Sequence, residues 1–486
     1  MAWRRGTFRA MPRRTKIVAT IGPACEDPST LASMAKAGMD VARLSLAHGP
    51  LEETLDRLAR VRAVDPGLGV LADLPGPKIR SGVFPEGGVH LADGAILDLV
   101  PGTEGEGSTE DRVVVDHPDL LVDLVPGDRI RLGDGALQLE VRDVDADRAS
   151  ALVTVGGWAR GRPGVTLPAG RLSMSSPTST DLRLLDALAG AGVEAVAISF
   201  VRSAADVERA RAAVSGSGLM LVAKIETQEA VDAVEEVIAA SDGVMVARGD
   251  LGIRCALEDV PHHQKRIIRT GAAYGRPVIT ATQMLESMVV SPVPTRAEVS
   301  DVANAVLDGT SALMLSAETA IGADPVAAVA TMSRVAVRAE ADFDYSGWGN
   351  SLGQQQAGAH GAPAASRITA AISAAARRAA IDAGVVAIIA CTTSGLTARA
   401  VSRFRPTMPV LAVTPSLRTA RQLQMAWGIR SVIDQKRATQ DETVWFAVEA
   451  AARLGVVKPG DVVAVVVGSP DTPEPLTDTL RLVQVR

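Results

Sequence analysis

Short apolar, β-branched runs alternate with amphipathic stretches along most of the chain. Eight of these runs are predicted to be strands, namely Lys16–Thr20, Val41–Leu44, Gly69–Ala72, Ala195–Ser199, Leu219–Lys224, Gly243–Val246, Pro277–Thr280 and Ala312–Leu315. Between most of them, apolar residues recur at three- and four-residue spacing, which predicts helices. The helices expected on this basis include Ser29–Ala37, Leu51–Val64, Thr180–Ala189, Ala204–Val214 and Ala230–Ala239. Repeated strand–helix units indicate a parallel sheet, and eight of them predict an α/β fold built on a (β/α)₈ TIM barrel.

One long segment interrupts this alternation between the third and fourth strands. Residues 76–172 are rich in Gly, Pro, Asp and Val and contain short strand-like pieces such as Val113–Val115 and Leu137–Val141. Turn pairs such as Pro126-Gly127 separate the pieces. We therefore expect an inserted all-β domain, a small β-barrel, that would cover the mouth of the main barrel as a lid.

A second interruption follows the eighth unit. Residues 346–366 are rich in Gly, Gln, Ala and Ser, which is typical of a linker or surface loop. An α/β pattern then resumes, with a helix at Ile368–Ala383 and strands at Val386–Ala390, Val410–Val413 and Val462–Val467. The expected organisation is a basic N-terminal extension (1–12), the barrel (13–75 and 173–345), the inserted lid (76–172), the linker (346–366) and a C-terminal α/β domain that could hold an effector site (367–486).

Composition narrows the class of protein. The 486 residues include 50 Lys and Arg against 56 Asp and Glu, and the net charge of −6 argues against nucleic-acid binding. Aromatic residues make up only 3%, so stacking platforms for single-stranded nucleic acid are not expected. No apolar run is long enough for a membrane span. Cys25, Cys255 and Cys391 are too widely spaced for a metal motif or a disulfide framework, so we expect a cytoplasmic protein.

Polar residues gather at the predicted strand ends, where the active site of a (β/α)₈ barrel lies. Seven of the eight ends carry them: Arg43 and His48; Asp73 with Lys78 and Arg80 just beyond; Ser199 and Arg202; Lys224 and Glu226; Arg248 and Asp250; Thr282 and Gln283; Ser316 and Glu318. Because the strands are parallel, we expect these side chains to converge at one mouth.

Lys224 and Glu226 are two residues apart, so they share one face of an extended strand. With Asp250 at the end of the next strand, two carboxylates can hold a hard divalent cation such as Mg²⁺. Seven of the 50 basic residues are lysine, and arginine cannot supply a compact ammonium in its place. The alternative is a buried lysine–carboxylate pair that only supports the barrel.

Three arginines, Arg43, Arg80 and Arg248, add guanidinium groups of the kind that pair with phosphate oxygens, although any one of them could instead form a surface ion pair. Gly249 lies where a helix begins, so backbone N–H groups there can approach an anion, although an ordinary βα turn also explains the glycine. Cations, a metal and a polyanionic substrate suit phosphoryl transfer and, equally, enolate chemistry.

Two hydroxyls and one histidine have less specific readings. Thr282 and Ser316 could position a proton-relay water, or they could cap the helices that follow. His48 could contact a nucleotide, but a lone histidine in a loop is also a common structural residue.

An ordered set of motifs resembles the pyruvate kinase family: RRTKIVATIGPA, VARLSLAHG, GPKIR, AKIET, MVARGDLG, TATQMLESM, PTRAEVSDVANAVLDG and LMLSAETA. The resemblance extends from about Arg13 to Val485. It implies the same barrel, β lid and C-terminal α/β domain. It also implies a homotetrameric phosphotransferase that transfers the phosphoryl group of phosphoenolpyruvate to ADP, giving pyruvate and ATP in the last step of glycolysis.

The resemblance also implies a role for each matching position. Glu226 and Asp250 would bind Mg²⁺ or Mn²⁺, and Lys224 would neutralise the transferring phosphoryl group and the enolate oxygen. Arg43 would contact the phosphoryl group. The backbone N–H groups of Gly249 and Asp250, with Thr282, would hold the substrate carboxylate.

The remaining implied roles concern protonation and the nucleotide. Thr282 and Ser316 belong to the region that protonates the enolate. Arg80, His48 and the lid acid Asp134 would lie at the nucleotide.

The second and third strands depart from the family pattern. Potassium-dependent members bind K⁺ through Asn and Ser where this chain has Ser45 and Ala47, through an Asp that is Asp73 here, and through a Thr that is Leu74 here. The position five after that Asp is acidic in those members and is Lys78 here. We therefore predict that Lys78, beside Asp73, replaces the monovalent cation and that K⁺ is not required. The alternative is a solvent-facing lysine.

Two further regions bear on ligands. Pro163 and Thr166 stand where the family has Lys and Asn, which removes one nucleotide contact. The loop that starts at Thr392 resembles the family's sugar-phosphate effector loop. Its hydroxyls and glycine could cradle a phosphate, and they are Thr392, Thr393, Ser394, Gly395 and Thr397. A simple βα turn is the alternative.

Two rival functions stay open from the sequence. A Mg²⁺-dependent aldolase or lyase on the same barrel also uses a KIE-like strand end and a downstream Asp, but it lacks the inserted domain and the TQMLES segment. A non-catalytic regulatory paralogue that binds phosphoenolpyruvate or a sugar phosphate would explain Ser45, Ala47 and Pro163. Retention of Lys224 and Glu226 argues against the paralogue.

Overall fold

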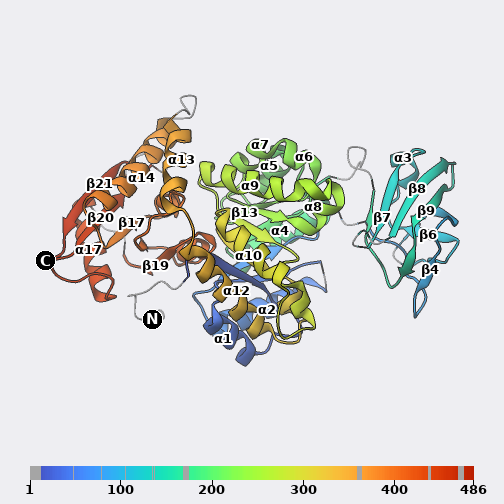
Figure 1. Cartoon of the computed structure of the whole chain (residues 1–486), viewed down its shortest axis with the longest axis horizontal. Coiled ribbons are helices and arrows are strands. Elements are labelled where there is room, and N and C mark those ends of the chain that lie inside the picture. Colours follow the sequence, from blue (N-terminus) through green and yellow to red (C-terminus); the bar gives the residue numbers. More distant parts are fainter. Residues whose placement is uncertain are drawn as a thin grey trace.

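The computed structural model describes residues 13–47, 49–77, 79–103, 105–133, 135, 137–167, 175–357, 364–435, 439–468 and 476–486. Figure 1 shows three bodies in a row, with the barrel between the C-terminal body and the lid. His48, Lys78, Asp134 and the extension 1–12 lie outside the described residues, so the predictions made for them stay predictions.

Eight parallel strands form the central body and close into a barrel in the order β1-β16-β15-β14-β13-β12-β3-β2. They are β1 (Lys16–Thr20), β2 (Val41–Ser45), β3 (Gly69–Asp73), β12 (Ala195–Ile198), β13 (Met220–Ile225), β14 (Gly243–Ala247), β15 (Val278–Ala281) and β16 (Ala312–Leu315). Each predicted strand overlaps one of these, so the predicted TIM barrel is confirmed. The ring closes between β1 and β16, where Lys16 pairs with Ala312.

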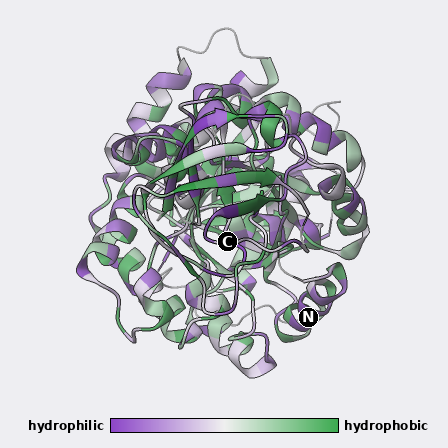
Figure 2. Cartoon of the chain, turned by 90° about the vertical axis from the view of Figure 1, so that its right-hand side faces the viewer, coloured by the Kyte–Doolittle hydropathy of each residue, from purple (hydrophilic) through white to green (hydrophobic). Residues whose placement is uncertain are grey.

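Strand side chains alternate between the barrel interior and the helical layer, because successive residues of a strand face opposite sides. Val18 and Met245 belong to the interior cluster, whereas Ile17 and Ala19 pack toward the helices. Met425, from the C-terminal body, joins the interior cluster and so contributes to the floor of the barrel. Figure 2 views the molecule from the lid side, and the helices around the edge carry both green and purple segments, as expected of helices with one buried face.

Helices cover the barrel, and several begin at a capping box that satisfies their first N–H groups. They are α1 (Pro28–Ala37), α2 (Leu51–Val64), α4 (Ser179–Ala191), α5 (Ala204–Ala213), α6 (Gln228–Asp232), α7 (Val234–Ala240), α8 (Arg248–Arg254), α9 (Val260–Tyr274), α10 (Arg296–Leu307), α11 (Ala317–Ala320) and α12 (Pro325–Ala341). Thr178 with Asp181 caps α4, and Thr295 with Glu298 caps α10. The helix predicted over Ala230–Ala239 is two helices, because Ala233 leaves helical geometry (φ −94°, ψ 24°).

The lid is an all-β body with one short helix, α3 (Leu120–Asp123). Its strands are β4 (Val89–Leu91), β5 (Ile96–Pro101), β6 (Arg112–Val115), β7 (Arg129–Leu132), β8 (Leu137–Val144), β9 (Ala149–Val155), β10 (Gly157–Ala159) and β11 (Val165–Thr166). Six form one sheet, β11-β7-β8-β9-β5-β6, and β10 pairs with β4. Isolated bridges from Arg80 to Gly164 and from Ser81 to Val115 connect the two edges of the six-stranded sheet. The sheet therefore curls into a small barrel that only single bridges close.

The C-terminal body has a five-stranded sheet in the order β19-β18-β17-β20-β21, in which only β21 is antiparallel to its neighbour. Its elements are α14 (Ala364–Asp382), β17 (Ala387–Cys391), α15 (Leu396–Ser402), β18 (Val410–Thr414), α16 (Leu417–Gln422), β19 (Ile429–Ile433), α17 (Gln440–Arg453), β20 (Val462–Val467) and β21 (Thr479–Gln484).

The expected linker 346–366 differs from the structure in its first part. Tyr345–Ala357 forms a helix, α13, and α14 begins at Ala364. The indole Nε1 of Trp348 donates to the carbonyl of Arg403 at 2.8 Å, so α13 is fastened to the C-terminal body. The Gly and Gln content predicted a loop. Composition does not reveal a tertiary contact such as that of Trp348, which stabilises the helix.

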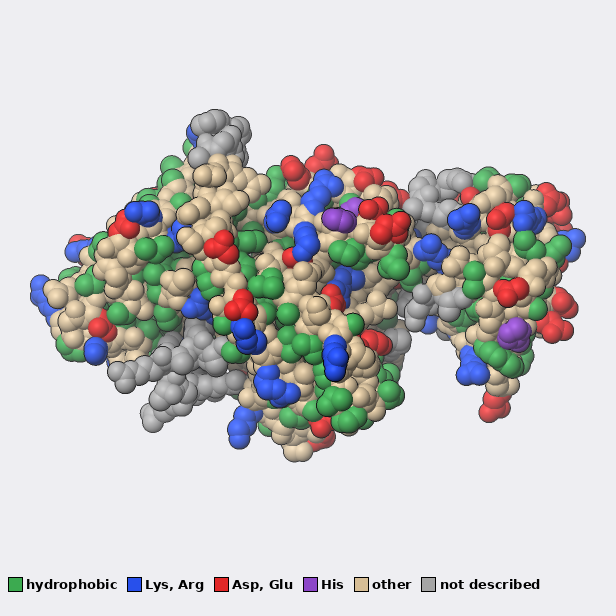
Figure 3. All heavy atoms as spheres, in the orientation of Figure 1, with side chains coloured by type: hydrophobic (Ala, Val, Ile, Leu, Met, Phe, Trp, Pro, Cys, Tyr) green, Lys and Arg blue, Asp and Glu red, His purple; other side chains and the backbone are tan. Residues whose placement is uncertain are grey.

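Charges of both signs are interspersed over the face of the molecule shown in Figure 3. Within the described ranges, no helix is both long and apolar enough to span a bilayer.

Candidate active site

The carboxyl ends of three barrel strands bring four predicted residues into one charged network. Arg43 comes from β2, Asp73 from β3, and Lys224 and Glu226 from the end of β13. Arg43 Nε lies 2.7 Å from Asp73 Oδ2. Lys224 Nζ lies 3.5 Å from Asp73 Oδ1 and 3.4 Å from Glu226 Oε2. Two cations and two carboxylates thus alternate across the mouth of the barrel.

A hydroxyl to which the sequence assigned no role fixes the position of Lys224. Lys224 Nζ donates to Ser199 Oγ at 2.7 Å, and Ser199 Oγ donates in turn to the carbonyl of Leu74 at 2.7 Å. An ammonium has three donors, so Ser199, Asp73 and Glu226 can share them. The position of Ser199 directly after β12 was the signal that could have identified it.

Burial and pairing push the pKa values of the two carboxylates in opposite directions. Burial alone would raise the pKa of Asp73, but Lys224 and Arg43 outweigh it and hold that pKa below its usual range. Burial raises the pKa of Glu226 to about 7, because Lys224 opposes it only in part and the charge of Asp250 adds to the increase. Burial likewise disfavours the charged form of Lys224, yet the surrounding carboxylates raise its pKa. The ammonium therefore stays charged at neutral pH.

Glu226 presents an oxygen with no hydrogen-bond donor. Its Oε1 accepts from the N–H of Phe200 at 2.7 Å, whereas its buried Oε2 accepts no hydrogen bond from any described group. Asp250, in the first turn of α8, is close enough for its charge to raise the pKa of Glu226. This oxygen, paired with Lys224 but accepting no hydrogen bond, and the nearby carboxylate of Asp250 fit a Mg²⁺ ion, which takes one or two protein carboxylates and completes its shell with substrate oxygens and water. The described residues contain no group of three or more His, Cys, Asp or Glu arranged to hold a metal.

The turn after β15 holds two consecutive residues in left-handed backbone. Thr282 has φ 68° and Gln283 has φ 52°, and a β-branched residue rarely adopts such values. Thr282 Oγ1 accepts from the N–H of Gly249 at 2.7 Å and donates to the carbonyl of Ala281 at 2.6 Å. The structure therefore joins Gly249 to Thr282 directly, and the N–H that the prediction assigned to a substrate carboxylate is bonded within the chain.

Arg248 clamps this turn. Its guanidinium donates to the carbonyls of Thr282 (2.7 Å), Ala281 (3.3 Å) and Gln283 (3.3 Å). Its Nη1 also lies 2.7 Å from Asp301 Oδ1. The donors of Arg248 thus hold backbone carbonyls and Asp301, as the ion-pair alternative predicts, and a phosphate contact by Arg248 stays a prediction.

Ser316 lies at the end of β16 and is tied to a buried carboxylate. Its N–H donates to Glu318 Oε2 at 2.6 Å, and Glu318 Oε1 accepts from the N–H of Leu285 at 3.1 Å. Glu318 is fully buried, so it links the ends of β15 and β16 from below the mouth. The sequence placed Glu318 at a strand end but gave it no role.

Arg80 lies in the lid and, within the part of the chain that the structure describes, makes no contact with the charged network of the barrel mouth. It pairs with Gly164 in an isolated bridge, and its Nη1 donates to the carbonyl of Arg162 at 3.5 Å. Pro163 lies in the same lid segment. The structure therefore places Arg80 in the lid itself. A contact between Arg80 and a nucleotide stays a prediction.

The predicted effector loop is held partly by its own side chains. Thr392 Oγ1 accepts from the N–H of Gly395, which has φ 84°, at 2.9 Å. Thr397 is buried and its hydroxyl lies 2.9 Å from that of Thr477. Thr393 and Ser394 are exposed. The loop thus exposes Thr393 and Ser394, whose carbonyls accept from Thr419 and Arg399, and Thr397 serves packing.

Comparison with known proteins adds a family. A family model described as "Pyruvate kinase, barrel domain" matches residues 12–329, and one described as "Pyruvate kinase, alpha/beta domain" matches residues 370–483. A protein named pyruvate kinase from Agrobacterium vitis is 41% identical over 477 residues, covering 97% of this chain and 98% of the relative. Similar proteins of that name from Methylorubrum extorquens (41% over 464 residues, 94% of each chain) and Geobacillus stearothermophilus (40% over 471 residues, 95% of this chain and 78% of the relative) also match.

Proposed function

The chain belongs to the pyruvate kinase family, and we propose from this premise that it transfers the phosphoryl group of phosphoenolpyruvate to ADP. In this reaction the bond from phosphorus to the enol oxygen breaks, its electron pair stays on that oxygen, and an oxygen of the ADP β-phosphate bonds to phosphorus. The enolate that remains takes a proton at carbon and becomes pyruvate. The observation that carries the proposal is the network of Arg43, Asp73, Lys224 and Glu226 at one barrel mouth.

In the proposed mechanism, Lys224 holds positive charge where negative charge develops. Asp73, Glu226 and Ser199 keep the ammonium charged and fixed, so no reorganisation is needed as the enol oxygen gains charge. Arg43, oriented by Asp73, presents its guanidinium to the phosphoryl oxygens. Positioning and charge neutralisation are the main contributions to phosphoryl transfer.

We propose that Glu226 and Asp250 hold Mg²⁺ or Mn²⁺. When bound, the divalent cation supplies positive charge to the phosphoryl and carboxylate oxygens of the substrate. Glu226 Oε2 supports this assignment, because it accepts no hydrogen bond and meets Lys224 Nζ as an ion pair at 3.4 Å, so it keeps lone pairs that a metal ion can use.

Protonation of the enolate belongs, in this proposal, to the strand ends that carry Thr282 and Ser316. The Arg248 clamp holds Thr282 in its left-handed conformation, and Glu318 holds the backbone of Ser316. These hydroxyls would orient the water that delivers the proton to the enolate carbon.

The monovalent-cation prediction carries over as a proposal: Lys78 replaces K⁺. Asp73 supports it, because both of its oxygens already face protein cations, Arg43 and Lys224. Leu74, where K⁺-dependent members have a Thr, has no side-chain oxygen, and its carbonyl already accepts from Ser199 Oγ at 2.7 Å. We further propose, from the family, a cytoplasmic homotetramer whose lid contributes Arg80, His48 and Asp134 to the nucleotide and whose loop at Thr392 binds a sugar phosphate.

The test is pyruvate and ATP formation by the full chain with phosphoenolpyruvate, ADP and Mg²⁺. Parallel reactions contain K⁺, Na⁺ or tetramethylammonium at equal ionic strength. We expect stoichiometric pyruvate and ATP at similar rates in all three salts. No turnover in any salt would identify a regulatory paralogue instead. Turnover only in K⁺ would retain the reaction and reject the role of Lys78.

A further inference from the structure

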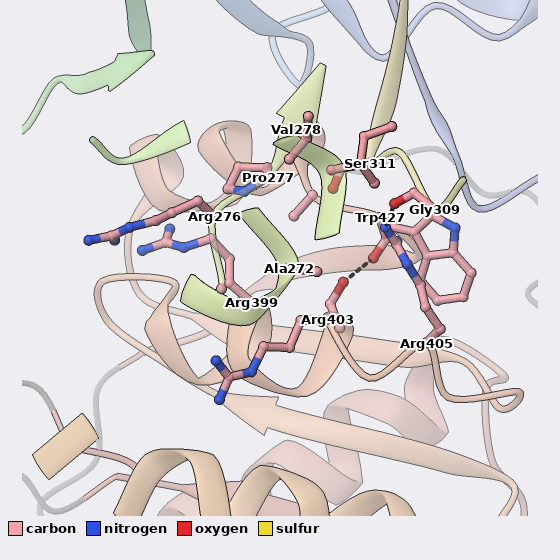
Figure 4. A pocket seen from close by; sticks show the side chains of 14 residues that line it. Ala272, Arg276, Pro277, Val278, Gly309, Ser311, Arg399, Arg403, Arg405 and Trp427 are labelled. Atoms are coloured by element: carbon pink, nitrogen blue, oxygen red, sulfur yellow. Dashed lines mark hydrogen bonds between the residues drawn. The ribbon is translucent and has the colours of Figure 1, made fainter. Parts of the chain in front are cut away.

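A second polar cavity lies at the opposite end of the barrel, between the barrel and the C-terminal body (Figure 4). Pro277 and Ser311, which line it, immediately precede β15 and β16, so the cavity is at the amino ends of the strands. About 20 Å³ of it is available to the centre of a water molecule, and the 340 Å³ of space around the lining includes open solvent. The charged network of Lys224 is at the carboxyl ends, so this cavity is separate from the candidate active site.

Four arginines line this cavity. Arg276 follows α9 in the barrel, whereas Arg399 lies in α15 and Arg403 and Arg405 follow it in the C-terminal body. Arg405 is 3% exposed, and the other three are partly buried. Figure 4 shows Arg276 and Arg399 side by side, and the positive charge of Arg276 lowers the pKa of Arg399. Like charges from two bodies therefore meet at one interface.

The charges of these arginines are compensated only in part, because Asp242 acts on Arg276 and Arg399, and Glu340 on Arg405, from beyond ion-pair distance. Each donates a hydrogen bond to a backbone carbonyl. The pairs are Arg276 with Ala239 (3.2 Å), Arg399 with Ser394 (3.4 Å), Arg403 with Ala273 (3.0 Å) and Arg405 with Gly309 (2.6 Å). Across the described part of the chain, none of the four forms an ion pair with a carboxylate. A carbonyl accepts a hydrogen bond but does not neutralise a guanidinium.

Several of their donors are also unused. The Nε groups of Arg276, Arg399, Arg403 and Arg405 are buried and have no hydrogen-bond partner, and neither has Nη1 of Arg405. Burying a charged donor without an acceptor costs free energy. Arg405 is partly compensated, because its guanidinium lies 4.4 Å from the ring centroid of Trp427. Arg403 lies 5.3 Å from the ring centroid of Phe404, so among the described residues Arg276 and Arg399 are the two without a ring contact or an ion pair.

We propose that this cavity binds a small phosphate-bearing anion, either free phosphate or a phosphomonoester, between the barrel and the C-terminal body. Guanidinium forks match phosphate oxygens, and a dianion would neutralise two of the unpaired charges. Pro277 and the Trp427 ring add apolar wall against which an organic group can pack.

A ligand held there would connect two bodies. Arg276 belongs to the barrel, and Arg399 lies in α15, which begins directly after the loop Thr392–Gly395. An anion bridging Arg276 and Arg399 would replace their repulsion by attraction and would stabilise the interface in proportion to its occupancy. The site is therefore placed to couple the C-terminal loop to the barrel floor.

The test measures binding, so it does not depend on the proposed reaction. Inorganic phosphate and, separately, glycerol 2-phosphate are titrated into the full chain by calorimetry at constant ionic strength. The chains compared are the wild type, the double variant Arg399→Met/Arg403→Met, the single variant Arg399→Lys, and the control Arg378→Met. Arg378 is exposed on α14 and pairs with Asp382. Its replacement removes the same charge as a replacement of Arg399 or Arg403, but outside the cavity.

We expect the wild type and Arg378→Met to bind one phosphate group that the double variant loses, with affinity about 10- to 100-fold weaker in Arg399→Lys. Tighter binding of glycerol 2-phosphate would identify a monoester ligand, and equal binding would identify free phosphate. Identical stoichiometry and affinity in the wild type and Arg399→Lys would overturn the proposal. Loss of binding together with dissociation of the subunits, measured by light scattering, would also overturn it. The arginines would then be subunit contacts.

Discussion

The Arg248 clamp leads to the most detailed prediction, for the variant Arg248→Lys. Left-handed backbone costs a non-glycine residue about 1–2 kcal/mol, so Thr282 and Gln283 together carry about 2–4 kcal/mol of strain. A hydrogen bond from a charged donor contributes about 1.5–3 kcal/mol. Arg248 makes one short bond to the carbonyl of Thr282 and two longer ones to its neighbours, so clamp and strain are of similar size.

A lysine ammonium cannot span three carbonyls and Asp301, so we expect the turn to relax and Thr282 Oγ1 to leave Gly249. Misplacement of a substrate-contacting group by about 1 Å can lower the rate about 100-fold. Steady-state assays with phosphoenolpyruvate and ADP should therefore show kcat lowered to that extent, with KM for ADP little changed. Arg338→Lys, which alters an exposed pair with Asp342, is the matched control.

A second change separates positioning from simple loss of charge. Glycine adopts left-handed backbone without the steric cost, so Gln283→Gly should restore part of the lost kcat in the Arg248→Lys background. Wild-type kcat in Arg248→Lys would refute the reasoning. A double variant no better than the single one would show that strain at Gln283 is not what the clamp opposes.

Three further predictions concern single residues. Ser199→Ala removes the 2.7 Å acceptor of Lys224, and kcat should fall about 10-fold or more, whereas an unchanged kcat would exclude a positioning role. Glu226 has a pKa raised to about 7 and must lose its proton to ligate Mg²⁺, so the affinity for Mg²⁺ should decrease as the pH falls below that value. Calorimetry in buffers of different ionisation enthalpy measures the proton release. A pH-independent affinity would reject Glu226 as a ligand. Glu194→Ala removes the buried carboxylate with which Arg62 and Arg421 form ion pairs at the barrel floor. The free energy of unfolding in urea should fall by about 3–5 kcal/mol with kcat unchanged, and a loss below about 1 kcal/mol would contradict this.

The barrel was predictable because its pattern is local and repeated. Eight apolar runs separated by amphipathic stretches identify the strands, and Lys16–Thr20 and Ala312–Leu315 were predicted with the observed bounds. The helix at Ala230–Ala239 was wrong in detail, because the break at Ala233 is a matter of backbone geometry that the apolar spacing does not reveal. The helix α13 was missed because contacts such as that of Trp348 stabilise it.

The sequence identified residues of the candidate site, but not the hydrogen bonds and ion pairs that connect them. Strand-end positions identified Lys224 and Glu226, because parallel strands bring their ends together. They could not show that Ser199 anchors the ammonium or that Arg248 faces backbone carbonyls, since both depend on side-chain directions and on the left-handed turn at Thr282. Residues that act through buried hydrogen bonds leave no spacing signal.

The central claim is that Lys224 neutralises charge during phosphoryl transfer from phosphoenolpyruvate to ADP. Its most direct test is the rate of pyruvate formation by the wild type, Lys224→Met and Lys36→Met, with Lys36 exposed on α1 as the matched control. We predict equal turnover in the wild type and Lys36→Met, and a rate lower by about 10²–10³-fold or more in folded Lys224→Met. A wild-type rate in Lys224→Met, or no pyruvate from the wild type, would contradict the account.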